Sequence, residues 1–295
     1  MKVYKRRAML RKLIIIFDKR YMSGFSIKYE SLLEQVRQEM QKQGISMRWQ
    51  TAVVEEIFAD EREGCLYIAD SPEIFETLRV KGCYAAALIH DGNSSAAFQG
   101  NCYILQGLDG LEYAYLEDVY RRLAGQPWDI LETERLKVRE SMVEDVEQFY
   151  RIYRDPSITY YMENLFEQPD MEKAYIKNYI RQVYGFYGYG LWTVLLKETG
   201  RVIGRAGLSV RDGYELPELG FVIEVSQQKK GYAYEVCRAI LDYTKRELQF
   251  DAVQALVKEE NKASACLLNK LGFTYQKKVY EEGTDYLLYT KFLGS

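Results

Sequence analysis

Hydrophobic residues recur with two different spacings along the first 128 residues, and the two spacings alternate. Continuous apolar runs of strand length occupy residues 13–17, 65–69 and 84–89. Segments with the spacing of an amphipathic helix separate them, at residues 31–43 and 72–81. Because strands that alternate with helices form parallel sheets, the pattern predicts a small α/β domain of Rossmann-like type.

After residue 128 the pattern changes to neighbouring strands and then to strand–helix pairs. Helical spacing follows at residues 234–248, and Gly272 is placed to end a further helix. Glycine and proline in Gly125-Gln126-Pro127 mark a break between the two patterns. We therefore expect two domains, residues 1–128 and 129–295. Strands are predicted in the second domain at Leu191–Leu196, Val202–Gly207, Glu218–Ile223 and Ala252–Val257.

The segment Gln228-Lys229-Lys230-Gly231-Tyr232-Ala233 lies between a predicted strand and a predicted helix, a position that suits an anion. The first N–H groups of a helix have no intrahelical acceptor, and the helix dipole adds partial positive charge there. Gly231 allows a pyrophosphate to approach the backbone, and the two lysines add charge at the rim. A glycine beside lysines also occurs at ordinary surface turns, so the interpretation depends on the strand–helix setting.

Four segments, taken in order, resemble the GCN5-related N-acetyltransferase (GNAT) superfamily, and in particular its ribosomal-protein alanine acetyltransferase branch. The resemblance runs from Glu132 to the C-terminus. It implies a C-terminal domain with a mixed, mostly antiparallel central sheet flanked by helices, and acetyl-CoA as cosubstrate without a metal. The four segments are Glu132–Arg139, which resembles the family's first strand, the hairpin 191–207, the loop 228–233, and Asn261-x-x-Ser264 with Leu271-Gly272-Phe273.

The resemblance also implies which residues would hold acetyl-CoA. The strand before the loop would diverge from its neighbour and offer backbone groups to the pantetheine arm. The pyrophosphate would lie over the loop, and an asparagine after the next strand would hold the cofactor arm. The residues in these positions are Phe221, Val222, Ile223, Gln228, Lys229, Lys230, Gly231, Tyr232, Ala233, Tyr234 and Asn261.

Three residues are candidates for catalysis of acyl transfer. Glu218 is the first candidate for the base that takes the amine proton, although it could equally be a surface or salt-bridged carboxylate. The position of the family's usual tyrosine acid holds Leu268, so Ser264 becomes the candidate partner of the leaving sulfur, with a helix cap as its alternative. Glu281 is a second candidate base, or part of an ordinary hairpin turn.

The N-terminal domain resembles the closing half of a haloacid-dehalogenase (HAD)-like Rossmann domain, in Cys65–Glu73 and Val80–Ala85. Active members of that superfamily carry a second acidic residue two positions after a nucleophilic aspartate, whereas this chain has Asp18-Lys19-Arg20. An arginine there places positive charge where Mg²⁺ needs oxygen ligands. We therefore expect a catalytically inactive domain, with Ser71 as a helix cap and no role for His90.

Composition limits the remaining classes of function. A net charge of −3 provides no basic face for direct nucleic-acid binding, and no apolar run is long enough to span a membrane. Five cysteines without a C-x-x-C pair favour a reducing, cytoplasmic location. Tyrosines and acidic residues within 143–189 would face an amine acceptor or pack as core residues. The expected partner is a small amine or a protein N-terminus, and the alternative is a non-catalytic acyl-CoA-binding sensor.

Overall fold

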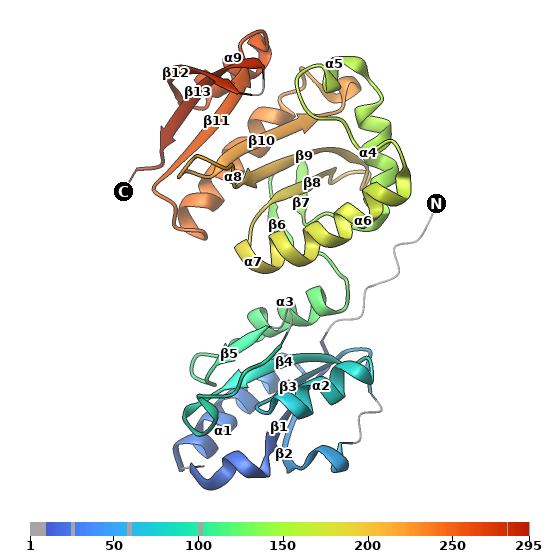
Figure 1. Ribbon diagram of the computed structural model, residues 1–295, viewed down its shortest axis with the longest axis vertical. Helices are drawn as coiled ribbons and strands as arrows, with labels where there is room; N and C mark the ends of the chain where they lie inside the picture. The colour runs from blue at the N-terminus through green and yellow to red at the C-terminus, as the bar shows by residue number, and fades with distance from the viewer. Residues whose placement is uncertain (1–9, 25–26, 58–60, 100–102, 282, 295) are drawn as a thin grey trace. The chain divides into compact units, whose positions relative to one another are not determined.

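The computed structural model describes residues 10–24, 27–57, 61–99, 103–281 and 283–294. The chain divides into two compact units, Met1–Trp128 (unit 1) and Asp129–Ser295 (unit 2) (Figure 1). Each unit contains its own sheet. No helix in the described part of the chain is both long and apolar enough to cross a membrane. Among the described cysteines all are free; Cys266 is exposed and the others are buried, and Cys102 lies outside the described residues.

Unit 1 is built on a five-stranded sheet in which all neighbouring strands are parallel, in the order β2-β1-β3-β4-β5. This confirms the parallel α/β sheet expected from the sequence. The edge strand β2 was not predicted, because its side chains are mostly polar and exposed and no apolar run marks it. The strands are β1 (Lys12–Asp18), β2 (Ser46–Ala52), β3 (Cys65–Ala69), β4 (Tyr84–Ile89) and β5 (Ile104–Gln106).

Helices cover both faces of this sheet. Side chains of α1 (Ile27–Lys42) and α3 (Tyr113–Leu123) share one hydrophobic core with one face, and α2 (Pro72–Val80) packs on the other. The start of α2 follows from its sequence, because the Ser71 hydroxyl accepts the Ile74 N–H at 3.4 Å and a proline occupies the first turn. Ser71 is thus the helix cap that the sequence predicted.

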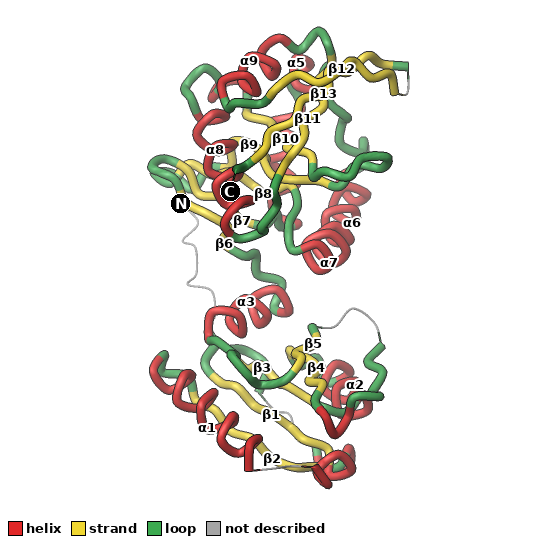
Figure 2. Tube along the Cα trace, turned by 90° about the vertical axis from the view of Figure 1, so that its left-hand side faces the viewer, coloured by secondary structure: helices red, strands yellow, loops and turns green. Residues whose placement is uncertain are grey.

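Unit 2 contains an eight-stranded sheet in the order β12-β13-β11-β10-β9-β8-β7-β6. Every junction is antiparallel except the one between β10 and β11, so the mixed, mostly antiparallel sheet is confirmed. Figure 2 shows β12 and β13 as a long hairpin at the edge of the sheet. The strands are β6 (Asp129–Glu132), β7 (Leu136–Arg139), β8 (Leu191–Leu196), β9 (Val202–Ser209), β10 (Glu218–Ile223), β11 (Ala252–Lys258), β12 (Thr274–Glu281) and β13 (Thr284–Phe292).

The segment Glu132–Arg139 is not the single strand that the sequence analysis expected. It contains the end of β6, a turn, and then β7, which pairs antiparallel with β6. The turn is closed by the Thr133 N–H, which donates to the Leu136 carbonyl oxygen at 2.9 Å. The alternation of apolar and polar residues begins only at Leu136, and the three polar residues before it form the turn.

Helices also cover both faces of the unit 2 sheet. Residues of α4, α5 and α6 form a core with one face, and residues of α8 and α9 form a larger core with the other (Figures 1 and 2). A π-helical turn at Ile180–Tyr184 follows α6. The helices are α4 (Val146–Tyr153), α5 (Pro156–Thr159), α6 (Pro169–Tyr179), α7 (Gly185–Tyr187), α8 (Tyr232–Arg246) and α9 (Lys262–Lys270).

The junction between β10 and β11 differs from all others in unit 2. Its ladder consists of one residue pair, Glu218 with Gln254. On their other sides β10 pairs along its whole length with β9, and β11 pairs along its whole length with β13. Because each strand follows its other neighbour, the two diverge after Glu218 and leave backbone groups of Leu219–Ile223 without a partner strand on that side.

Candidate functional site

The point where β10 and β11 diverge places two polar side chains on one face of the sheet. Glu218 and Gln254 are paired, and paired residues of neighbouring strands project to the same side. Gln254 is 3% exposed, and its Nε2 atom has no hydrogen-bond partner among the residues with described positions. A buried donor without an acceptor is costly. This end of the gap is therefore suited to a ligand that carries an oxygen acceptor.

The structure brings both candidate bases together around an arginine. Arg211 donates from one terminal nitrogen to Glu218 Oε2 at 3.2 Å and from the other to Glu281 Oε2 at 2.7 Å. The hydroxyl of Tyr214 donates to the second oxygen of Glu281. Sequence analysis missed Arg211 and Tyr214, because they lie between two strands in a segment without a motif. Only the β12–β13 hairpin brings Glu281 beside them.

The surroundings shift the pKa values of the two carboxyl groups in opposite directions. Burial raises the pKa of Glu218 above its usual value, Arg211 acts in the opposite direction, and the charge of Glu281 adds to the increase. Hydrogen bonds from Tyr214 and Arg211 lower the pKa of Glu281. A base works best when its pKa approaches the operating pH. By this criterion Glu218 is the better candidate base, and Glu281 is the carboxylate that stays ionised beside it.

The loop before α8 presents backbone donors, as the sequence predicted for an anion site. Gly231 has a φ of +86° and is the N-cap of α8. The first N–H in the helix that finds an acceptor belongs to Glu235, which donates to the Gly231 carbonyl oxygen at 3.0 Å. The N–H groups of Tyr232, Ala233 and Tyr234 have no acceptor in the part of the chain that the structure describes. The loop thus fits a pyrophosphate group.

Arg135 holds this loop, and sequence analysis missed it. It donates to the Lys230 carbonyl oxygen at 3.0 Å and to Glu235 Oε2 at 2.7 Å. Its guanidinium carbon lies 4.4 Å from the centre of the Tyr232 ring. Thr133 completes the contact by donating to Glu235 Oε1 at 2.6 Å. These bonds fix the start of α8 to the β6–β7 turn, which the single-strand interpretation concealed.

The remaining side chains predicted to hold the cofactor differ in how far they are exposed. Val222 and Ile223 are buried, whereas Lys229 and Lys230 are exposed at the rim of the loop. Gln228 donates from Nε2 to the Ile223 carbonyl oxygen at 2.9 Å, so it ties the loop to the end of β10. Phe221 is half-buried and packs against the core that β10 shares with α8.

The start of α9 corrects one interpretation of Ser264. Asn261 is the N-cap, because its side-chain oxygen accepts the Ser264 N–H at 3.0 Å. Ser264 is therefore not the cap, and its hydroxyl has no hydrogen bond among the described side chains. Leu268, at the position of the family's tyrosine acid, is fully buried in the core. No proton donor reaches the gap from that position.

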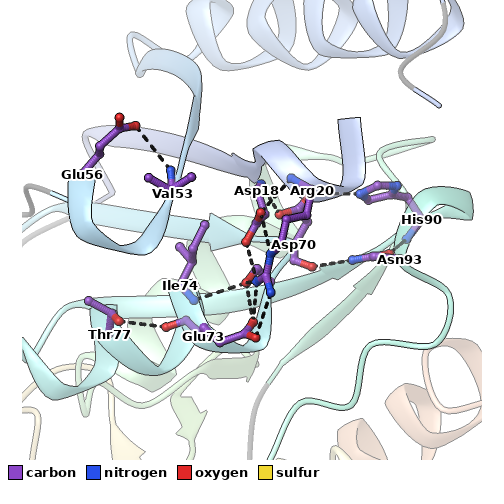
Figure 3. A network of polar contacts seen from close by, with 11 residues as sticks. Asp18, Arg20, Val53, Glu56, Asp70, Glu73, Ile74, Thr77, His90 and Asn93 are labelled. Atoms are coloured by element: carbon purple, nitrogen blue, oxygen red, sulfur yellow. Dashed lines mark hydrogen bonds and ion pairs between the residues drawn. The ribbon is translucent and has the colours of Figure 1, made fainter. Parts of the chain in front are cut away.

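Unit 1 has a separate polar cluster where β1, β3 and β4 end (Figure 3). The strand order changes direction between β1 and β3, and ligands of doubly wound sheets bind at the carboxyl ends of such strands. Asp70 accepts the Asp18 N–H at 2.7 Å and lies 3.1 Å from His90 Nε2. His90 Nδ1 accepts the Gly92 N–H at 3.1 Å, so the ring proton is on Nε2 and points to Asp70. The buried groups of this cluster satisfy one another.

Arg20 closes the same cluster. It donates to both carboxylate oxygens of Asp18, at 3.0 and 2.7 Å, and to Glu73 at 3.2 and 2.9 Å. The hydrogen bond from Arg20 lowers the pKa of Asp18, and bonds from Arg20 and Ser71 lower the pKa of Glu73 to about 2. Among the described residues, no group of three or more histidine, cysteine or acidic side chains is placed to hold a metal ion.

Comparison with known proteins agrees with the arrangement in unit 2. Residues 135–274 match the family model described as an acetyltransferase (GNAT) domain. The chain is 30% identical to the uncharacterised protein YkkB of Bacillus subtilis over 154 residues, which are 50% of this chain and 87% of YkkB. It is 30% identical to the uncharacterised N-acetyltransferase p20 of Bacillus licheniformis over 149 residues, 49% of this chain and 82% of p20.

Solved structures give matches of lower identity. A GNAT-family acetyltransferase of Bordetella pertussis is 22% identical, covers 56% of this chain and 99% of its own, and has a TM-score of 0.48. A ribosomal-protein-S5-alanine acetyltransferase of Vibrio fischeri is 17% identical, covers 55% and 95%, and also has a TM-score of 0.48. On the sequence matches, the chain belongs to the GNAT acetyltransferase family, and it is an acyltransferase.

A glutamate at position 231 is expected to weaken acetyl-CoA binding, because its negative charge would repel the pyrophosphate at the helix start and its side chain would lie beside Arg135. We expect Gly231→Glu to weaken the affinity at least about tenfold in calorimetry, the loss of one charge-assisted contact. Gly200→Glu is the control, since Gly200 has a similar positive φ in open surroundings. Equal affinity in both variants would place the cofactor elsewhere.

Removal of the Arg20 side chain is expected to destabilise unit 1, because it leaves the buried Asp18 carboxylate without its counter-charge. We expect Arg20→Ala to lower the free energy of unfolding of β1 and β3 by roughly 1–3 kcal/mol, as measured by hydrogen exchange of their amides. The difference in stability between variant and wild type should shrink as the pH falls below 3.8 and through the lowered pKa of Asp18, because a protonated Asp18 needs no counter-charge. Arg37→Ala, which removes an exposed pair with Glu34, should change the opening little.

Proposed function

We propose that unit 2 transfers an acetyl group from acetyl-CoA directly to a primary amine, which belongs to a protein N-terminus, a polyamine or another small amine. Acetyl-CoA, when bound, supplies an activated acyl thioester. The observation that carries the proposal is the divergence of β10 from β11, with Glu218 at its closed end. The chain's own residues then have to bind the cosubstrate, place the amine and accept its proton.

Three groups of atoms would hold the cosubstrate. Backbone groups of β10 that have no partner in β11 would face the pantetheine arm, and the free N–H groups at the start of α8 would face the pyrophosphate. Lys229 and Lys230 add positive charge at the rim, and the Asn261 amide lies at the start of α9, beyond the end of β11. The orphaned Gln254 Nε2 supports a ligand oxygen at the closed end of the gap.

Proton transfer would fall to Glu218. Its carboxyl group has a raised pKa and accepts the proton of the incoming ammonium group, while Arg211 keeps the carboxylate oriented. Glu281 remains ionised and balances the charge of Arg211. Ser264 Oγ, which is half-buried, is the proposed hydrogen-bond donor to the sulfur atom. Placement in the ribosomal-protein acetyltransferase branch is part of this proposal and rests on the resemblance alone.

For unit 1 we propose a catalytically inactive HAD-like domain that serves docking or regulation. The contact between Arg20 and Asp18 supports this proposal, because the guanidinium group donates hydrogen bonds to both carboxylate oxygens of Asp18. The full-length protein with Mg²⁺ and a chromogenic phosphomonoester should release no phosphate. Hydrolysis that depends on Asp18 would overturn the proposal.

The direct test of transfer is thiol release from acetyl-CoA by the full-length protein with a panel of amines and peptides. Release that requires an acceptor supports the proposal and identifies the acceptor. Binding of acetyl-CoA without release under any acceptor would favour the sensor instead. Ser264→Ala and Glu281→Gln should each lower the rate, and if neither does, the roles assigned to them are wrong.

Glu218 is expected to set the acidic limb of the pH profile. Since only the ionised carboxylate accepts a proton, kcat/KM should rise with pH through the raised pKa of Glu218. Glu218→Gln should lower kcat by at least about 100-fold, the contribution of a general base, while acetyl-CoA affinity in calorimetry is retained. Glu215→Gln removes an exposed neighbouring carboxylate and serves as the control. An unchanged pH profile in Glu218→Gln would exclude this residue as the base.

A further inference from the structure

The carboxylate of Glu235, in the first turn of α8, is bound by the turn between β6 and β7. Its Oε1 atom accepts the Thr133 hydroxyl at 2.6 Å and the Arg135 N–H at 3.0 Å, and its Oε2 atom accepts Arg135 Nε at 2.7 Å. Burial raises the pKa of Glu235, but hydrogen bonds from Thr133 and Arg135 bring it below its usual value. The carboxylate is therefore ionised near pH 7.

Arg135 also contacts the loop on both sides of Gly231. Its Nη1 atom donates to the Lys230 carbonyl oxygen at 3.0 Å, and its guanidinium carbon lies 4.4 Å from the centre of the Tyr232 ring. A Cβ atom at Gly231 would lie 3.4 Å from Arg135 Nη2. Arg135 thus lies against the loop at the point where the backbone enters α8.

The position of Glu235 creates an electrostatic conflict with a bound anion. A carboxylate in the first turn stabilises a helix, but it repels a second negative group at the same end. Glu235 follows Gly231 by one helical turn, so its charge lies beside the free N–H groups of residues 232–234. The guanidinium of Arg135 offsets that charge. Without it, α8 would present an uncompensated carboxylate to a pyrophosphate.

Arg135 also holds the loop in one shape before any ligand arrives. A loop that becomes ordered only on binding loses affinity, because the cost of ordering is subtracted from the binding free energy. The β6–β7 turn is a firm support, since β7 pairs with both β6 and β8. The bond from Arg135 to the Lys230 carbonyl oxygen transmits this support to the loop.

We propose that Arg135 is a positioning residue for the pyrophosphate of acetyl-CoA, which aligns the N–H groups of the loop and offsets the charge of Glu235 beside them. It acts through the loop and Glu235, and proton transfer at Glu218, at the other end of β10, does not involve it. The inference rests on the proposed binding of acetyl-CoA at this loop. It adds a residue from the β6–β7 turn, which the loop sequence itself does not contain.

The first experiment compares ligands with and without the pyrophosphate by calorimetry of the full-length protein. Arg135→Met should weaken the affinity for CoA by about tenfold or more, the value of a charge-assisted hydrogen bond, and leave the affinity for pantetheine unchanged. Arg135→Lys should lose less, because it keeps the charge but cannot bind Glu235 and the Lys230 carbonyl together. It carries the comparison if the methionine variant does not fold.

Lys137→Met is the matched control. Lys137 forms a similarly exposed ion pair with Asp129 in the same hairpin, at 2.9 Å. No printed contact joins this pair to the loop, so the affinity for CoA should stay at the wild-type value. An equal loss in Lys137→Met and Arg135→Met would show that the hairpin matters only for folding, and would overturn the inference.

The second experiment separates positioning from a structural role in the thiol-release assay. Arg135→Met should raise KM for acetyl-CoA by about tenfold, with kcat and the KM of the acceptor unchanged. With S-acetylpantetheine, which lacks the pyrophosphate, the variant should match the wild type. A general structural defect would lower the rate with both thioesters. Equal losses with both would therefore contradict the role given to Arg135.

The outcomes distinguish the inference from the proposed function. If the affinity for CoA depends on Arg135 but no acceptor releases thiol, the inference stands and the transfer proposal fails. If CoA binds more tightly than pantetheine by the same factor in the wild type and in Arg135→Met, the cosubstrate site stands and the inference is wrong. If the wild type binds both ligands equally, the pyrophosphate does not lie at the loop, and both fail.

Discussion

The inability of β10 to pair with β11 beyond Glu218 is the constraint on which the candidate site depends. Each strand is fully paired on its other side, while the two share a single residue pair. The divergence leaves backbone groups of both strands without a partner strand on that side, and these groups are available for a ligand. The loop before α8 and the carboxyl group of Glu218 acquire their possible functions from their positions at this gap.

Arginines define the other parts of the molecule that can or cannot accept a ligand. Arg20 occupies both oxygens of Asp18 and closes the cluster at the strand ends of unit 1. Arg211 joins Glu218, whose pKa is raised by burial, to Glu281, whose pKa is lowered by hydrogen bonds from Tyr214 and Arg211. The same side chain thus closes one site and tunes a second.

Local patterns predicted the elements well, and long-range contacts were the part that could not be predicted. The apolar runs of β1, β3 and β4 and the glycine before α8 are local signals, and the structure places them as strands and a helix start. The polar edge strand β2 and the turn at Thr133–Arg135 carry no such signal. Arg211 meets Glu281 only through the pairing of β12 with β13, which no spacing in the sequence encodes.

The most direct test of the central claim is hydrogen exchange of the full-length protein with and without acetyl-CoA. The account predicts that acetyl-CoA slows exchange at two separate segments, the amides of Leu219–Ile223 facing the gap and those of residues 231–234 at the start of α8. Protection at both would show that the divergent strands and the loop form one binding site. Binding without protection at either segment, or no binding, would contradict the account.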